Sequence, residues 1–122
     1  MRKVLVVDDD VLIRLTVTDA LEEAGFEVIE ASTADEAMDK MDDGAINFLF
    51  TDIQMPGRLT GVDLAHEVAA RFPEAGIVVA SGRIMPCDID LAPLARFYSK
   101  PYDLKQIVAG FEAMSRRTDF DI

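Results

Sequence analysis

The chain has 122 residues, half of them hydrophobic, and a formal net charge of -11 at pH 7. This length predicts one domain over residues 1–122, with 118–122 as a short tail. The 23 acidic residues outnumber the 12 basic ones, and the only adjacent basic pairs lie near the two ends. Nucleic acids and anionic membranes are bound by clustered Lys and Arg, so we expect neither as a partner.

The cysteine content and the apolar runs bear on location. Cys87 is the single cysteine and has no internal partner, which fits a reducing compartment. Only residues 4–7 are continuously apolar near the start, which is too short for a signal peptide. No apolar run approaches the roughly 20 residues that span a bilayer. We therefore expect a cytoplasmic protein.

Short apolar segments alternate with segments of helical periodicity. The predicted strands are 4–7, 27–30, 47–51, 77–80 and 96–99, of which 27–30 is the weakest and belongs near an edge. Capping residues predict helices that begin at Asp10, Thr33, Thr60 and Asp103. For Thr33 and Thr60 the pattern is that of a capping box.

This alternation predicts an α/β fold. Strands that are apolar on both faces and separated by helices indicate a parallel sheet covered on both sides. Right-handed crossovers then produce a doubly wound, five-stranded parallel sandwich. Ligands bind such sheets at the carboxyl ends of the strands, near the point where the strand order reverses.

Polar residues follow four of the five predicted strands. In chain order they are Asp8, Asp9 and Asp10, then Asp52, then Ser81, and finally Lys100. Each is ordinary when taken alone, since aspartates turn chains and cap helices and most lysines are solvated. Together they would converge on one edge of the sheet.

That combination suits phosphoryl transfer. Clustered carboxylates repel one another, and a hard divalent cation such as Mg²⁺ relieves the repulsion. An aspartate can act as a nucleophile and form an acyl phosphate. Lys100 and Ser81 supply a positive charge and a hydrogen-bond donor for the phosphoryl oxygens. The set is complete for accepting a phosphoryl group on Asp52.

Three segments resemble the receiver domains of two-component response regulators, of the stand-alone, chemotaxis-regulator-like type. They are VLVVDDD at 4–10, FTDIQMPG at 50–57 and YSKPY at 98–102, and the resemblance covers residues 2–117. It implies a flavodoxin-like (βα)5 sandwich. It also implies a histidine kinase or phosphotransfer protein as phosphodonor and an unidentified downstream protein.

The resemblance assigns roles to matched positions. Asp52 would be the phosphoacceptor, and Mg²⁺ would be held by Asp8, Asp9, Asp52 and the backbone carbonyl of Gln54. Ser81 and Lys100 would contact the phosphoryl group, and Phe97 would change rotamer on activation. The peptide bond before Pro101 would be cis, and Gln54 and Arg83 would tune the lifetime of the acyl phosphate.

Two departures from the common receiver pattern stand out. The loop 57–60 is one residue longer than in the short form and resembles receivers attached to hybrid histidine kinases. In 83–95, Pro86 and Pro93 leave room for only a short or irregular fourth helix. This predicts a remodelled output face.

Three alternatives are weaker. A phosphohydrolase of the haloacid dehalogenase type needs a second aspartate two residues after the nucleophile, where this chain has Gln54. A degenerate receiver that only binds partners usually lacks the acceptor, the acid pair or the lysine, and this chain retains all of them. An EF-hand at Asp8 to Asp10 lacks the alternating acids, the central Gly and the terminal Glu.

Overall fold

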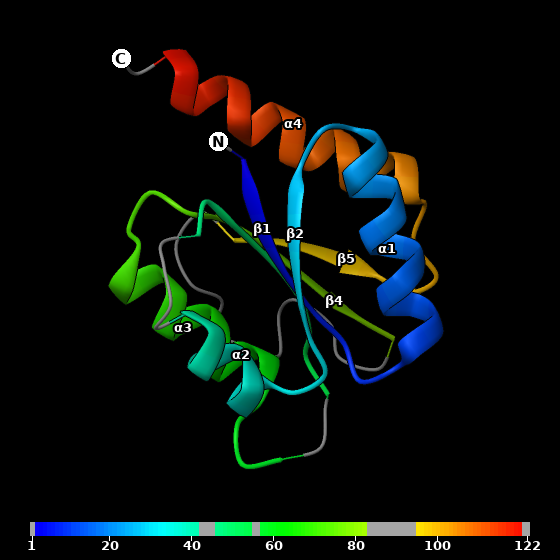
Figure 1. The fold of residues 1–122 in the computed structure, drawn as a ribbon, viewed down its shortest axis with the longest axis vertical. Coiled ribbons are helices and arrows are strands. Elements are labelled where there is room, and N and C mark those ends of the chain that lie inside the picture. Colours follow the sequence, from blue (N-terminus) through cyan, green and yellow to red (C-terminus); the bar gives the residue numbers. More distant parts are fainter. Residues whose placement is uncertain (1, 42–45, 55–56, 83–94, 121–122) are drawn as a thin grey trace.

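The structure is a computed structural model that describes residues 2–41, 46–54, 57–82 and 95–120 (Figure 1). The shortened or irregular fourth helix predicted within 83–95, and with it Arg83, lies outside these ranges apart from residue 95. The remodelled output face predicted from that segment therefore stays a prediction.

The described chain alternates strands and helices as predicted. The strands are β1 (Lys3–Val7), β2 (Glu27–Ala31), β3 (Phe48–Asp52), β4 (Gly76–Ser81) and β5 (Ala95–Ser99). The helices are α1 (Val11–Glu23), α2 (Ala34–Met41), α3 (Gly61–Arg71) and α4 (Leu104–Phe120).

All five strands run parallel in the order β2-β1-β3-β4-β5, so the predicted α/β class and parallel sheet are confirmed. β2 lies at one edge, as its weaker apolar pattern predicts. The strand order reverses between β1 and β3, because the chain adds β2 on one side of β1 and β3 on the other.

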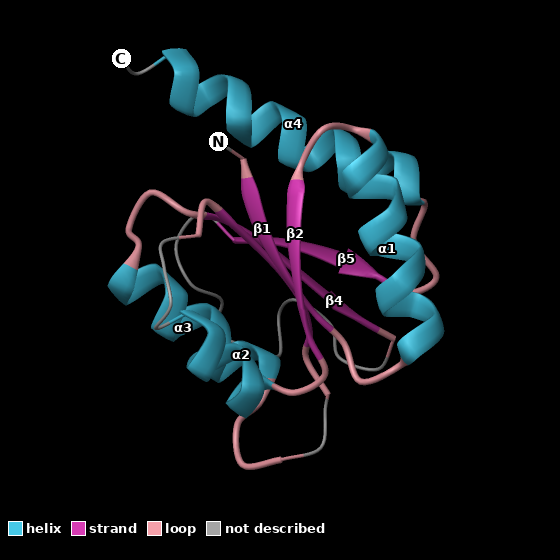
Figure 2. Cartoon of the chain, viewed as in Figure 1, coloured by secondary structure: helices cyan, strands magenta, loops and turns pink. Residues whose placement is uncertain are grey.

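Helices cover both faces of the sheet (Figure 2). α1 and α4 lie together on one face, and α2 and α3 on the other. The central strands are buried on both sides, so alternate residues of one strand enter different cores. Leu5, Val7 and Leu49 pack in one cluster with α2 and α3, while Val4, Val6 and Phe50 pack in the other with α1 and α4.

The predicted caps at Asp10 and Thr60 are confirmed. The Asp10 carboxylate accepts hydrogen bonds from the amides of Leu12 and Ile13 at the start of α1. Thr60 and Asp63 form a complete capping box at the start of α3. These caps end the preceding loops close to the carboxyl edge of the sheet.

Two details differ from the predictions. At the start of α2 the Thr33 hydroxyl accepts from the Glu36 amide, but the Glu36 carboxylate accepts from the amide and hydroxyl of Ser32 and not from Thr33. The predicted capping box is therefore only half formed, because the exposed carboxylate finds two donors one residue earlier. In addition, α4 continues through 118–120, which were predicted as tail, since neither Gly nor Pro follows Gly110.

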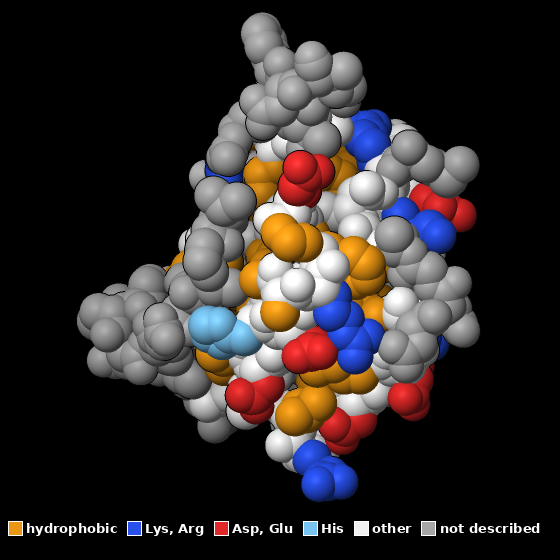
Figure 3. Space-filling view, turned by 90° about the vertical axis from the view of Figure 1, so that its left-hand side faces the viewer, with side chains coloured by type: hydrophobic (Ala, Val, Ile, Leu, Met, Phe, Trp, Pro, Cys, Tyr) orange, Lys and Arg blue, Asp and Glu red, His pale blue; other side chains and the backbone are white. Residues whose placement is uncertain are grey.

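The surface agrees with the charge argument on the one face that Figure 3 shows. Acidic and basic side chains are interspersed there, with no basic cluster among the side chains coloured by type. Within the described ranges, no helix combines the length and apolar character needed to cross a membrane.

Candidate functional site

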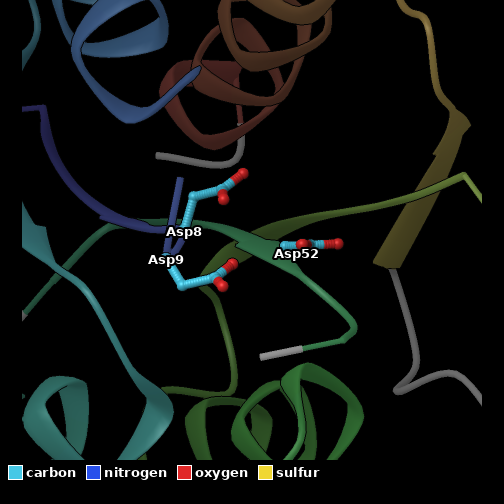
Figure 4. A group of neighbouring side chains, drawn as sticks. All are labelled: Asp8, Asp9 and Asp52. Carbon is cyan, nitrogen blue, oxygen red and sulfur yellow. The ribbon is translucent and has the colours of Figure 1, made fainter. Parts of the chain in front are cut away.

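The predicted acids meet where the strand order reverses. Asp8 and Asp9 directly follow β1, and Asp52 is the last residue of the neighbouring strand β3. Figure 4 shows the three side chains on this edge, where one carboxylate oxygen of each lies within 4.8 Å of the others. The sheet topology brings them together, because parallel strands present their carboxyl ends on the same edge.

Asp8 is the most deeply buried of the three, with an exposed fraction of 0%. Its Oδ1 accepts a hydrogen bond of 2.9 Å from the Asp10 amide. Its Oδ2 has no hydrogen-bond partner among the described residues and lies 3.7 Å from the Lys100 ammonium. Burial raises the pKa of Asp8, against the opposing effects of the Asp10 amide and of Lys100.

Asp52 is 8% exposed, and its Oδ2 lies 3.3 Å from Nζ of Lys100. Burial raises its pKa as well, and the charge and hydrogen bond of Lys100 oppose that rise. The Asp52 backbone is closely held, since the buried Thr51 hydroxyl donates to its carbonyl at 2.9 Å. The first residue of α3, Gly61, packs directly against the same carbonyl.

Lys100 lies between Asp8 and Asp52, and its ammonium forms an ion pair with each of these two buried carboxylates. Its backbone is fixed by a hydrogen bond of 2.9 Å from the Lys100 amide to the Ser81 carbonyl. The Lys100–Pro101 peptide bond is cis, as the resemblance implies. Ser81 itself is buried at the end of β4, the strand beside β3.

The donor set fits a divalent cation. Among the described residues, three carboxylates converge here with one ammonium, so part of their negative charge is uncompensated by these residues in a partly dehydrated place. The unpartnered Oδ2 of Asp8 is a buried oxygen that lacks a donor among the described residues, which a hard cation would satisfy. Asp8, Asp9 and Asp52 are thus the residues that could hold Mg²⁺.

The other predicted site residues are Gln54, Phe97 and Arg83. Gln54 is exposed two residues after Asp52. Phe97 is half-buried on β5 and packs against the core cluster on the α2–α3 face. Arg83 lies outside the described residues, so its predicted role stays a prediction.

The sequence interpretation missed three residues that the structure brings to the site. Arg14 donates from Nη1 to the Asp8 carbonyl at 2.8 Å. Gly61 leaves room for the Asp52 carbonyl. The Tyr102 hydroxyl is buried without a hydrogen-bond partner among the described residues, and burial, then the charge of Asp8, raises its pKa. Gly61, at the predicted start of a helix, and Tyr102, at the end of the YSKPY segment, carried a local signal, whereas Arg14 carried none.

The doubly wound parallel sheet is also the fold of a CheY-like receiver domain from Methanospirillum hungatei, which superposes with a TM-score of 0.81 at 23% identity and covers 98% of each chain. Residues 4–112 match the response regulator receiver domain, and the chain belongs to this family.

Relatives and solved structures agree with this assignment. The response regulator receiver protein CpdR of Brucella abortus is 30% identical over 118 residues, which cover 93% of this chain and 97% of CpdR. The chemotaxis protein CheY of Thermotoga maritima is 29% identical, with 94% of this chain and 98% of CheY covered. The receiver domain of NtrX from Brucella abortus superposes with a TM-score of 0.79 at 32% identity, covering 91% of this chain and 96% of that domain. The receiver domain of the hybrid histidine kinase CckA does so with a TM-score of 0.78 at 25% identity, covering 92% and 97%.

Proposed function

We propose that this protein is a cytoplasmic phosphoacceptor module of a two-component system or phosphorelay, which takes a phosphoryl group onto Asp52 in a Mg²⁺-dependent reaction. The observation that carries the proposal is the position of the Asp52 carboxylate, which lies beside Asp8 and Asp9 and 3.3 Å from the Lys100 ammonium. A nucleophile, a cation site and a fixed positive charge are thereby within one small region.

In the proposed step, a carboxylate oxygen of Asp52 attacks the phosphorus of a phosphohistidine on the donor protein. The new P–O bond forms as the P–N bond breaks, and the bonding electron pair leaves with the imidazole nitrogen. The product is an acyl phosphate on Asp52, and the donor histidine takes up a proton from solvent.

The residues of the chain have separate tasks in this step. Lys100 would exchange part of its contact with the Asp52 carboxylate for the incoming phosphoryl oxygens, and the Ser81 hydroxyl would donate to another of them. When bound by Asp8, Asp9 and Asp52, with the Gln54 carbonyl as a further predicted ligand, Mg²⁺ would neutralise charge on the phosphoryl oxygens. Phe97, Gln54 and Arg83 keep their predicted roles in switching and in phosphoryl lifetime.

The surface next to the site suits a protein donor. Val11, Leu12 and Leu15 on the first turns of α1 are exposed, and Leu12 is 75% exposed. A groove of about 590 Å³ runs beside Leu12 toward Lys100 and Tyr102. Large apolar side chains in contact with water next to a reactive group indicate a place where a partner docks. We infer that the histidine-bearing partner covers this patch during transfer.

We expect no turnover of an external substrate. Gln54 stands where a phosphohydrolase of the aspartyl-phosphate type needs an acid and base, and an amide side chain provides neither. Slow loss of phosphate from Asp52 itself is expected, and the phosphorylated module would act by binding another protein or by passing the phosphoryl group on.

Intact-mass spectrometry after incubation with acetyl phosphate and MgCl₂ tests the proposal. One added phosphoryl group is expected on the wild type, lost in hydroxylamine, and absent in EDTA and in Asp52→Ala. Because some acceptors take phosphate only from their protein donor, beryllofluoride binding followed by NMR is the second arm. If the wild type shows no adduct and also binds no beryllofluoride, the proposal is contradicted, and a module that only binds partners is favoured.

A further inference from the structure

Arg14 ties the turn after β1 to the neighbouring strand β2. Its Nη1 donates to the backbone carbonyl of Asp8 at 2.8 Å, and its Nε donates to Oε1 of Glu30 at 3.1 Å. The Arg14 side chain is only 16% exposed. One planar guanidinium therefore holds two chain segments at once, which a single-point ammonium does less well.

The turn that Arg14 holds is the one that presents the acid pair. The Asp8 amide donates to the Ala31 carbonyl at 3.2 Å, and the Asp10 amide donates to Oδ1 of Asp8 at 2.9 Å. Arg14 occupies the remaining backbone acceptor of Asp8, its carbonyl. Amide, side chain and carbonyl of Asp8 are thus all engaged, and Oδ2 is left directed to the site.

Glu30, the second residue that Arg14 contacts, lies on a strand that is held in place by α2. Glu30 belongs to β2, and its backbone carbonyl accepts a hydrogen bond from the Lys40 ammonium of α2. The guanidinium therefore braces the acid-bearing turn against a strand that is held by a second element.

We propose that Arg14 is a positioning residue for cation binding, which holds the Asp8 carbonyl so that the Asp8 and Asp9 carboxylates are pre-organised for Mg²⁺. The inference rests on the proposed function, because it takes the three aspartates as the Mg²⁺ site. Groups that orient metal ligands commonly change metal affinity by about 10- to 100-fold when removed. A ligand turn held in place loses less conformational freedom on binding.

Simple electrostatics predicts the opposite sign. A positive charge near three carboxylates repels a cation, so removing it would strengthen Mg²⁺ binding if charge alone mattered. Positioning predicts that removal weakens binding. The sign of the change therefore decides between the two roles.

The experiment is a titration of the full chain with MgCl₂, followed by the backbone amide signals of residues 8 to 10 in NMR spectra. The variants are Arg14→Gln and Arg14→Lys. The matched control is Arg71→Gln, because Arg71 forms a comparable i,i+4 pair with Glu67 at 2.9 Å, at the end of α3 opposite to Gly61 and the Asp52 carbonyl. Thermal unfolding in EDTA reports the fold of each variant separately.

Arg14→Gln is expected to raise the Mg²⁺ Kd about tenfold, and Arg71→Gln to leave it unchanged. Arg14→Lys keeps the charge but not the two-point contact, so it is expected to weaken binding too, and it serves as the test if the Gln variant does not fold. Unchanged or tighter binding in Arg14→Gln, or unchanged binding in Arg14→Lys, would overturn the positioning role alone. A wild type that shows no Mg²⁺ response would overturn the proposed function together with it.

Discussion

Gly61 offers a direct test of how tightly the phosphoacceptor strand is packed. It is the first residue of α3, and its amide donates to the Ile53 carbonyl at 2.9 Å. A Cβ at this position would lie 1.9 Å from the carbonyl oxygen of Asp52, 2.8 Å from its carbonyl carbon and 2.9 Å from the Ile53 Cα. These are backbone atoms, so no side-chain rotation relieves the contact.

Substitution of Gly61 by alanine must therefore move α3 away from the end of β3 by about 1 Å or more. Overpacking of this kind costs about 1–3 kcal/mol and occasionally more. The better helix propensity of alanine returns at most about 1 kcal/mol, and less at a first helical position. A net loss of about 2 kcal/mol is expected, a large share of the roughly 5–15 kcal/mol that stabilises a typical domain.

Urea unfolding of Gly61→Ala measures this loss. With a slope of about 1–3 kcal/mol per molar urea, the midpoint is expected to fall by about 1 M. Acetyl phosphate labelling of Asp52 should also slow, because the carbonyl that shifts belongs to the acceptor. Gly82→Ala is the control, since a Cβ there lies 3.5 Å from Cβ of Lys100, an ordinary contact. Stability of Gly61→Ala equal to or above wild type would refute the packing argument.

Three further predictions concern charge and surface. Hydrogen bonds from Ser32, and then from Lys40, lower the pKa of Glu36 to about 2. The Glu36 carboxylate therefore stabilises the fold fully at pH values above its ordinary pKa, and this contribution is lost as the pH falls toward 2. Glu36→Gln should lower the free energy of unfolding, measured with urea at pH 7, by less than about 1 kcal/mol, because the group is largely exposed. A difference from wild type that persists undiminished at pH 3 would contradict the assignment. Asp8→Asn should raise Tm in EDTA, because it removes a buried charge. It should also lose the stabilisation that Mg²⁺ binding gives, which for a ligand at 100 times its Kd is roughly 2.7 kcal/mol. A Mg²⁺-dependent rise in Tm equal to that of wild type would exclude Asp8 as a ligand. Leu12→Ser should leave Tm and acetyl phosphate labelling unchanged. It should slow phosphoryl transfer from a phosphohistidine protein about tenfold, which corresponds to about 1.4 kcal/mol. Equal transfer rates for wild type and variant would exclude the α1 patch as the docking surface.

The order of elements and the chemical residues could be predicted from the sequence because both depend on local patterns. A run such as 4–7 is apolar at every position, which marks a strand buried on both faces wherever it is placed in the sheet. Asp10 and Thr60 cap helices through contacts two or three residues away. Parallel topology then places Asp8, Asp52 and Lys100 at one edge without knowledge of any distance.

The capping box at Thr33 marks where such local inference fails. The pattern correctly identified the helix start, yet the Glu36 carboxylate accepts hydrogen bonds from Ser32 and not from the Thr33 amide. Both donors lie within reach of one long side chain, so their competition depends on the loop geometry and not on spacing along the chain.

What the sequence by itself determined is the parallel α/β sheet and the set of residues that could carry a phosphoryl group, since periodicity and strand ends are properties of short segments. Only the tertiary structure decided how those residues are held. The contact of Gly61 with the Asp52 carbonyl, the place of Lys100 between two acids, and the reach of Arg14 to both Asp8 and Glu30 join segments that meet through crossovers. Such contacts depend on the relative positions of whole elements, which packing of the two cores sets and no local pattern encodes.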